Sequence, residues 1–198
     1  MQRELDALES NETWSFMDLP PGKRFIGCKW VFKANHKPNG TIDRYKARLV
    51  VKGYTQTEGI EYFETFSPVV KIITIRFILS LESAKGCILH QLDVNNVFLH
   101  GDLDDEIYMT PPAGLTLSPT QVCKLRKYLY GTKQASRQWN SKLTHNVIQL
   151  GYVQNTVDHS LFIRTNNHFF TVPLIYVDDI MLVDNNLQEI QRVKTLLS

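Results

Sequence analysis

The sequence has few cysteines and no paired metal-binding motif. Its three cysteines, Cys28, Cys87 and Cys123, lie far apart without a CxxC pair, and its six histidines show no paired spacing either. A disulfide framework or a structural zinc site needs such residues in close pairs. We therefore expect reduced thiols in an intracellular protein, and we assign no role to zinc.

Long hydrophobic runs are also missing. The longest apolar segments, residues 169–177 and 180–183, are separated by two aspartates and are far shorter than the ~20 residues of a membrane-spanning helix. The N-terminus lacks the apolar stretch of a secretory signal, and the chain contains no internal repeat. With 198 residues, 43% of them hydrophobic and 21% charged, the chain is predicted to be globular, not secreted and without a membrane partner.

Acidic residues are absent from a long stretch of the chain. Residues 107–157 contain no aspartate or glutamate, and Tyr128, Tyr130 and Trp139 lie among the basic residues of this stretch. A second basic run, in residues 29–52, contains Asp43 as its only acid. Basic runs are usually solvated surface, but two of them with interleaved aromatic residues are typical of a surface that binds a polyanion. The basic residues of the two runs are Lys29, Lys33, Lys37, Arg44, Lys46, Arg48 and Lys52, and then Lys124, Arg126, Lys127, Lys133, Arg137 and Lys142.

The clearest local pattern is a β-hairpin. Residues 28–34 and 41–51 alternate in polarity, and the sequence Lys-Pro-Asn-Gly at residues 37–40 between them is typical of a tight turn. Alternate residues of a strand lie on opposite faces. One face of the hairpin is therefore predicted to be apolar and the other cationic.

Stop and start signals define the other elements. Gly86 and Gly151 are helix stop signals. Asn186, followed three residues later by Glu189, predicts a capping box at the start of the last helix. Pro173 cannot donate a ladder hydrogen bond, so it predicts an edge or strand-entry position. The remaining expected elements are helices over residues 2–8, 72–84 and 135–150, and strands over residues 13–19, 87–94, 161–164, 169–177 and 180–183.

Two adjacent acids, Asp178 and Asp179, lie between apolar strand segments. Neither residue readily takes the positive φ of a tight hairpin turn, and the flanking residues are too apolar for a solvated loop. Adjacent carboxylates beside a core strand lose hydration and raise each other's pKa unless cations neutralise them. A metal ion is the natural partner of this pair, and an ordinary acidic turn is the alternative.

Asp93 ends another apolar strand. A single aspartate at a strand end is usually a helix cap, but together with the acid pair it provides a third oxygen ligand. Oxygen ligands without histidine or cysteine select Mg²⁺ or Mn²⁺. Two such ions ~3.5–4 Å apart can activate a hydroxyl nucleophile and stabilise the leaving oxygen of a phosphoryl transfer. The residues therefore predict nucleotidyl transfer with two Mg²⁺ or Mn²⁺ ions.

Short motifs follow one another along nearly the whole chain. They are WVFK at residues 30–33, RYKARLV at 44–50, KGYTQ at 52–56, ETFSPVVK at 64–71, QLDVNN at 91–96, FLHGDL at 98–103, LYG at 129–131, KQA at 133–135 and YVDD at 176–179. In type and order, this series resembles the reverse transcriptase of copia-type LTR retrotransposons, which is a part of their Pol polyprotein. The resemblance implies an α+β right-hand polymerase fold: a palm of antiparallel sheet backed by helices, a fingers subdomain, and a missing or incomplete thumb. We expect the fingers at about residues 1–70 and 105–134, and the palm at about residues 71–104 and 135–198.

The resemblance also implies roles for single residues. Asp93, Asp178 and Asp179 are similar to the catalytic, metal-binding triad of the family. Phe98 is similar to the aromatic gate that excludes the 2′-hydroxyl of a ribonucleotide, and a core phenylalanine is the alternative.

Nucleotide-binding residues follow from the same resemblance. Arg48 and Lys33 resemble the cations of the fingers that hold the triphosphate, and Lys46 or Lys37 could take the place of Lys33. The template-gripping turn of the family corresponds to Tyr130 and Gly131.

The implied activity is RNA-directed DNA synthesis. The expected partners are an RNA or DNA template with its primer and a dNTP, and the expected location is a cytoplasmic particle or the nucleus. Because the chain stops at Ser198 within an expected helix, we expect a fragment of a Pol polyprotein that also contains RNase H and integrase. The alternatives are a non-catalytic, nucleic-acid-binding remnant of a degenerate retrotransposon, and another two-metal enzyme such as a nuclease.

Overall fold

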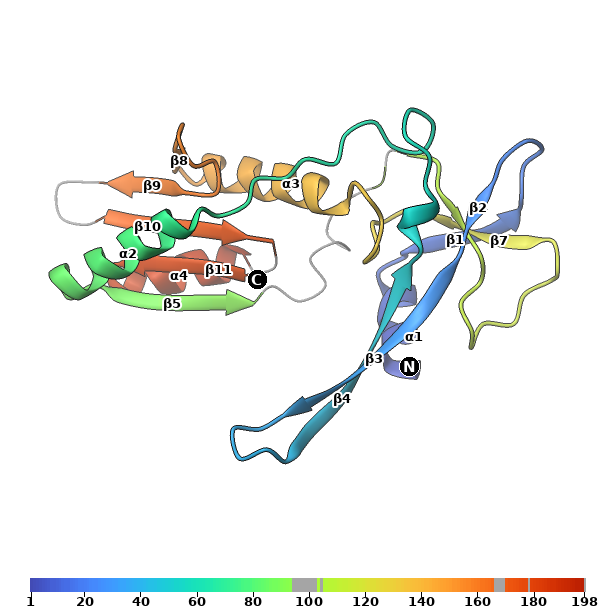
Figure 1. The fold of residues 1–198 in the computed structure, drawn as a ribbon, viewed down its shortest axis with the longest axis horizontal. Helices are drawn as coiled ribbons and strands as arrows, with labels where there is room; N and C mark the ends of the chain where they lie inside the picture. Colours follow the sequence, from blue (N-terminus) through green and yellow to red (C-terminus); the bar gives the residue numbers. More distant parts are fainter. Residues whose placement is uncertain (94–102, 104, 166–169, 178, 198) are drawn as a thin grey trace. The chain divides into compact units, whose positions relative to one another are not determined.

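The chain divides into two compact units (Figure 1). In this computed structural model, residues 1–93, 103, 105–165, 170–177 and 179–197 are described. Unit 1 contains Met1–Thr65 and Phe98–Ala135, and unit 2 contains Phe66–Val97 and Ser136–Ser198. Both units combine helices with mainly antiparallel strand pairs, in agreement with the predicted mixture of α and β structure.

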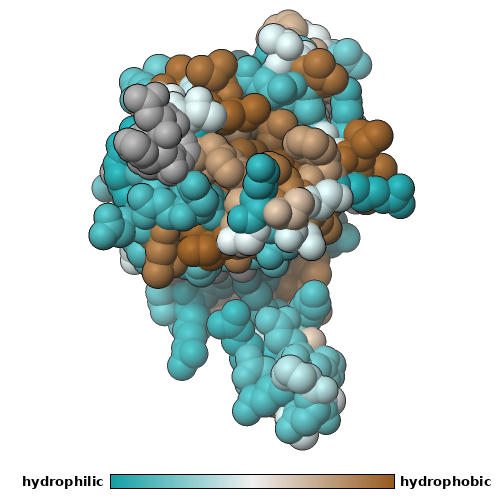
Figure 2. Space-filling view, turned by 90° about the vertical axis from the view of Figure 1, so that its left-hand side faces the viewer, coloured by the Kyte–Doolittle hydropathy of each residue, from teal (hydrophilic) through white to brown (hydrophobic). Residues whose placement is uncertain are grey.

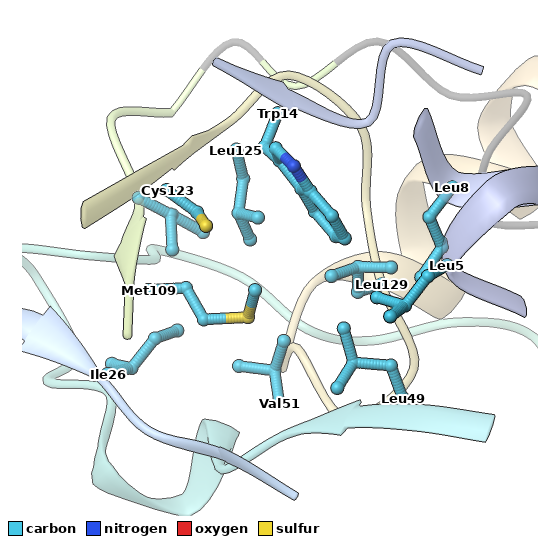
Figure 3. Packing of buried hydrophobic residues seen from close by; sticks show 11 residues of the cluster. Leu5, Leu8, Trp14, Ile26, Leu49, Val51, Met109, Cys123, Leu125 and Leu129 are labelled. Atoms are coloured by element: carbon cyan, nitrogen blue, oxygen red, sulfur yellow. The ribbon is translucent and has the colours of Figure 1, made fainter. Parts of the chain in front are cut away.

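Unit 1 is built around a four-stranded sheet. The order of its strands is β1 (Trp14–Asp18), β7 (Gln121–Leu125), β6 (Tyr108–Met109) and β2 (Phe25–Ile26), with β2 and β6 parallel. Helix α1 (Gln2–Ser10) contributes Leu5 and Leu8 to the core, where both are almost fully buried. Figure 3 shows these leucines with Trp14, Met109, Leu125 and other apolar side chains of the same cluster.

A two-stranded hairpin of β3 (Cys28–His36) and β4 (Ile42–Val51) also belongs to unit 1, followed by the 3₁₀ helix η1 (Gly53–Thr55). The register makes Lys33 and Lys46 Cα partners on one face, as the alternation predicts. The apolar face is covered only at its base, because Leu49 is 1% exposed whereas Phe32 is 67% and Tyr45 79% exposed. The predicted hairpin, with its turn at residues 37–40, is confirmed.

Unit 2 contains a five-stranded antiparallel sheet with helices α2 (Ile72–Lys85), α3 (Ala135–Gln149) and α4 (Leu187–Leu197). Helix α4 packs on β5 and β11 (Figure 1). Buried residues that include Ile78 of α2, Leu174 and Val183 form its core. The order of the strands is β5 (Ile88–Asp93), β11 (Asp179–Asp184), β10 (Phe170–Tyr176), β9 (Phe162–Thr165) and β8 (Val153–Gln154).

Helix α2 is capped at both ends. Gly86 follows its last turn with a φ of 64°, which is the left-handed cap that the sequence predicts. At the other end, Asp158 accepts hydrogen bonds from the backbone N–H of Lys71, at 3.3 Å, and from Thr74 Oγ1, at 2.5 Å. Asp158 therefore satisfies one free N–H group at the start of the helix, and a side-chain hydroxyl of its first turn, from a distant part of the sequence.

Two predictions from the sequence are wrong in detail. Pro173 lies in β10, an inner strand of the sheet, and not at an edge or a strand entry. The N–H of Ile175 bonds to the carbonyl of Ser160, which lies on the β9 side of β10. The backbone N–H groups of the odd-numbered residues in β10 therefore point toward β9. The pairing of β10 with β9 covers Phe170 and Thr171, and an isolated antiparallel bridge joins Leu174 to Leu161 in the same register. The ladder is therefore interrupted at positions 172 and 173, where the proline has no N–H to donate.

The capping box at α4 forms only in part. Asn186 Oδ1 accepts a hydrogen bond from the N–H of Gln188 at 2.9 Å, as predicted. The backbone N–H of Asn186 bonds to Oδ1 of Asp184, at 2.5 Å, and not to Glu189. Oε1 of Glu189 instead accepts hydrogen bonds from Nη1 of Arg164, at 2.7 Å, and Nη1 of Arg192, at 2.8 Å. The charged partners compete successfully because charge-assisted bonds are stronger than a bond to a neutral backbone N–H.

The three cysteines are free, as expected. Burial raises the pKa of Cys123 to about 12, so this thiol stays protonated. None of the helices in the described ranges has the length and apolar composition that a membrane-spanning segment needs.

Candidate active site

Asp179 is the first residue of β11 and follows closely on the end of β10 at Tyr176. Tyr176 and Asp179 are Cα partners, so only positions 177 and 178 lie between the paired residues. Val177 has a φ of 52°, a region that β-branched residues rarely occupy and that costs about 1–3 kcal/mol. The sequence suggested no residue of the acid pair for a left-handed conformation, and the structure has this conformation at Val177, the residue before the pair.

The register of unit 2 brings two predicted site residues together. Asp93, at the end of β5, and Asp179, at the start of β11, are Cα partners in neighbouring antiparallel strands. Residues in this relation are adjacent across the sheet. The side chain of Asp179 is half-buried.

Other predicted residues of the triad region are not described. Asp178, Phe98 and the side chain of Asp93 lie outside the described residues. Within the described part of the chain, no group of three or more histidine, cysteine, aspartate or glutamate side chains could hold a metal ion.

Two side chains outside the hairpin bond to its turn. Trp139 of α3 donates a hydrogen bond from its indole Nε1 to the carbonyl oxygen of Val177 at 2.7 Å. Gln91 of β5 donates one from its Nε2 to Oδ1 of Asp179 at 2.9 Å. Neither residue was predicted from the sequence to belong to the site. The position of Gln91, two residues before Asp93 and thus on the same face of β5, was the one available signal for it.

An apolar hollow of about 230 Å³ lies beside Asp179 in unit 2. Hydrophobic side chains are also exposed on this unit, and Figure 2 shows several hydrophobic areas among hydrophilic ones. The hollow therefore gives Asp179 apolar neighbours on one side, while its hydrogen bond from Gln91 is exposed to solvent. Its lining consists of Val70, Ile75, Leu89, Leu174 and Met181, with Gln91, Tyr176 and Asp179 as the polar residues.

The predicted nucleotide-binding residues lie in unit 1. Arg48 and Lys46 share the cationic face of β4 with Lys33 on β3. The guanidinium carbon of Arg48 lies 4.5 Å from the centroid of the Tyr130 ring, within the range of a cation–π contact. Lys33 is exposed, and so is Lys37 in the turn.

Gly131 has a structural reason for being glycine. Its φ is 93°, and a Cβ atom at this position would lie 2.2 Å from the carbonyl oxygen of Val51. The N–H of Val51 also bonds to the carbonyl of Tyr130 at 2.7 Å. The backbone that approaches Gly131 closely, at the predicted template-gripping turn, is thus the protein's own strand β4.

The aromatic residues of the acid-free stretch differ in exposure. Tyr128 is 1% and Trp139 6% exposed, so neither ring is available on the surface for stacking with a base. Tyr130 is half-buried under Arg48. Of the three aromatic residues that lie among the basic residues of this stretch, two therefore belong to the core, and the polyanion prediction depends on the basic residues.

Comparison with known proteins identifies relatives over the whole chain. A family model described as "Reverse transcriptase (RNA-dependent DNA polymerase)" matches residues 11–198. The chain is 42% identical over 189 residues, or 94% of its length, to the "Retrovirus-related Pol polyprotein from transposon RE1" of Arabidopsis thaliana. It is 44% identical over 201 residues, or 100% of its length, to the "Retrovirus-related Pol polyprotein from transposon TNT 1-94" of Nicotiana tabacum. The chain spans only 13% and 15% of the length of these two relatives.

Proposed function

Because the chain belongs to the reverse transcriptase family of RNA-dependent DNA polymerases, we propose that it is the fingers-and-palm part of an RNA-directed DNA polymerase of a copia-type retrotransposon. The resemblance of its motifs to this family is confirmed by the match. The observation that carries the proposal is the Cα pairing of Asp93 with Asp179 beside the strained turn. In this reading, the reaction is the transfer of a deoxynucleotide from a dNTP to the 3′-hydroxyl of a primer on an RNA or DNA template.

The two compact units support the division into subdomains. We assign the fingers to about residues 1–70 and 105–134, and the palm to about residues 71–104 and 135–198. The unit boundaries after Thr65 and Ala135 lie close to these limits. The five-stranded antiparallel sheet of unit 2, on which α4 packs, is consistent with a palm.

Reverse transcriptases generally use divalent metal ions. The donor set of this chain fits Mg²⁺ or Mn²⁺, because both ions prefer carboxylate oxygens and because two of the three aspartates are Cα partners. Asp93, Asp178 and Asp179 are the residues that would hold two such ions. When bound, the ions activate the primer hydroxyl and stabilise the leaving oxygen.

The other residues bind and orient the substrates. Arg48 and Lys33 bind the triphosphate through charge-assisted hydrogen bonds, and the ring of Tyr130 holds the Arg48 side chain in place. Phe98 excludes the 2′-hydroxyl of a ribonucleotide by steric overlap. The backbone at Tyr130 and Gly131 contacts the template.

The test is primer extension by the chain and by its Asp178→Asn variant. Removing one carboxylate from the triad should abolish Mg²⁺-dependent extension while circular dichroism shows an unchanged fold. The matched control is Asp18→Asn, because Asp18 is an exposed aspartate that accepts a hydrogen bond from Thr120 in unit 1. Equal incorporation by the wild type and Asp178→Asn contradicts the proposal.

Two other outcomes separate the remaining candidates. Binding of a primer–template without extension by the wild type favours the nucleic-acid-binding remnant, for which the cationic face of the β3–β4 hairpin is sufficient. Shortening of a labelled primer in place of its growth favours a nuclease.

A further inference from the structure

The turn between β10 and β11 is held by two hydrogen bonds from outside the hairpin. One comes from the indole of Trp139 and ends on the backbone carbonyl of Val177. The other comes from the side-chain amide of Gln91 and ends on the carboxylate of Asp179. The backbone of the turn and its carboxylate are thus fixed by separate donors, and neither donor has a part in the reaction proposed above.

The Trp139 bond acts on the strained residue of the turn. A positive φ at a valine persists only where the surrounding structure determines it. The indole is 6% exposed, and a hydrogen bond shielded from water is stronger and more costly to lose than an exposed one. Trp139 therefore fixes the carbonyl of Val177, two residues before Asp179.

The Gln91 bond acts on the orientation of a carboxylate. Gln91 is the Cα partner of Met181, and Asp93 is the Cα partner of Asp179, so Gln91 lies diagonally across from Asp179 on the same face of the sheet. A carboxylate has two oxygens with about four acceptor sites. The neutral amide uses one oxygen, Oδ1, and the other, Oδ2, receives no bond from Gln91.

We propose that Trp139 and Gln91 are positioning residues that preorganise the aspartates of this turn for divalent-metal binding. The inference rests on the proposed function, since it takes these aspartates to be metal ligands. Partners that orient a ligating carboxylate typically affect metal affinity about 10- to 100-fold. Because each bond here has a neutral donor, we expect the loss of either one to weaken metal binding about five- to tenfold.

The first experiment compares Trp139→Phe with Trp30→Phe. Trp30 also donates an indole hydrogen bond to a backbone carbonyl, that of Ala113 at 3.0 Å, but it lies in unit 1. Both changes remove one indole N–H and keep an aromatic ring. Binding of Mn²⁺ to the full chain is measured by the electron paramagnetic resonance signal of free Mn²⁺. We expect weaker binding for Trp139→Phe and unchanged binding for Trp30→Phe.

The second experiment compares Gln91→Met with Gln154→Met. Gln154 is a second amide donor on a strand of unit 2, and its Nε2 bonds to the carbonyl of His159 at 2.7 Å. Methionine keeps the length of the side chain and removes the donor. Because the bond of Gln91 to Asp179 is exposed, Gln91→Met should fold even if Trp139→Phe does not. Only Gln91→Met should weaken Mn²⁺ binding.

Primer extension gives a readout that a purely structural role does not change. If the two residues act through the metal site, the activity lost in Trp139→Phe and Gln91→Met should recover at higher Mn²⁺ concentration. A loss of folded protein would not be recovered in this way. Unchanged Mn²⁺ affinity in a folded variant overturns the role of that residue.

Failure of the proposed function is distinguishable from failure of this inference. A wild-type chain that neither binds Mn²⁺ nor extends a primer contradicts the proposed function. In that case, hydrogen exchange of the amides in residues 174–181 decides whether Trp139 holds the turn: faster exchange in Trp139→Phe than in Trp30→Phe supports it, and equal exchange overturns it.

Discussion

The most informative test of the fold is removal of the charge at Asp158. The carboxylate is 5% exposed. Its Oδ2 accepts hydrogen bonds from Lys71 N and Thr74 Oγ1, and its Oδ1 accepts hydrogen bonds from Ser160 N, at 3.1 Å, and Ser160 Oγ. This one side chain thus joins the start of α2 to the segment before β9.

The expected loss for Asp158→Asn follows from these bonds. Asparagine keeps one acceptor oxygen, but its NH₂ group replaces the other oxygen and faces the donors of that side. Hydrogen bonds to a charged acceptor contribute about 1.5–3 kcal/mol each. Losing two of them, with partial recovery when the Thr74 hydroxyl rotates, should lower the free energy of unfolding by about 3 kcal/mol. For a chain of this size, the melting temperature should fall by about 6–12 °C.

The pH dependence of stability gives an independent check. Burial raises the pKa of Asp158, but the hydrogen bonds from Ser160, Thr74 and the backbone N–H groups outweigh it, so the pKa in the folded state lies below its usual value. The ionised carboxylate of Asp158 therefore stabilises the folded state at pH values above the ordinary aspartate pKa of about 3.9. This contribution is lost as the pH falls from there through the lowered pKa of the folded state.

Urea unfolding followed by circular dichroism measures both effects. The stability difference between the wild type and Asp158→Asn should be largest near neutral pH and should shrink as the pH falls below about 4. The control is Asp18→Asn, which removes an exposed acceptor and should change stability by less than about 0.5 kcal/mol. Equal urea midpoints for Asp158→Asn and the wild type, or a difference that does not vary with pH, would refute the reasoning.

Three further outcomes follow from the structure. Glu189→Gln should lower the free energy of unfolding, measured by urea unfolding, by about 2–3 kcal/mol, because it leaves Arg164 and Arg192 without their shared carboxylate. A loss below about 0.5 kcal/mol, as for an ordinary surface substitution, would contradict this expectation. Gly131→Ala should lower the free energy of unfolding by at least about 2 kcal/mol in the same assay, since the new Cβ would overlap the carbonyl oxygen of Val51. A variant as stable as the wild type would show that the backbone relaxes easily at this contact. Arg48→Lys should raise the KM for dNTP about tenfold in steady-state extension assays and leave stability nearly unchanged. Lysine keeps the charge but loses the planar guanidinium that stacks on the Tyr130 ring. An unchanged KM would remove Arg48 from the nucleotide site.

Local patterns predicted the elements whose stability is decided nearby in the sequence. The β3–β4 hairpin follows from its alternation and its Asn-Gly turn, and the end of α2 follows from Gly86. Features set by distant residues were missed. The cap of α2 by Asp158 and the recruitment of Glu189 by Arg164 both depend on tertiary packing, which no window of sequence contains.

The same division applies to the candidate site. The residue types predicted an acidic metal site, and both Asp93 and Asp179 were placed at strand ends. Their direct pairing depends on the register between β5 and β11, which the intervening chain does not specify. The left-handed backbone conformation of Val177 goes against the local preference of a β-branched residue. It is explained by the surrounding structure, which includes the hydrogen bond from Trp139. Such disagreement between local preference and structure is common at functional sites.

The division of the chain into two discontinuous units has a consequence for anyone who wants to dissect it. A deletion series from either end cannot isolate one unit, because strand β1 completes its sheet only with β7, and β5 pairs only with β11 among the described strands. During synthesis, β1 and β5 stay unpaired until β7 and β11 have been made, although the β3–β4 hairpin can form within the first half of unit 1. Separate production of the palm-like piece would therefore need a designed linker that joins residue 97 to residue 136 in place of the intervening segment.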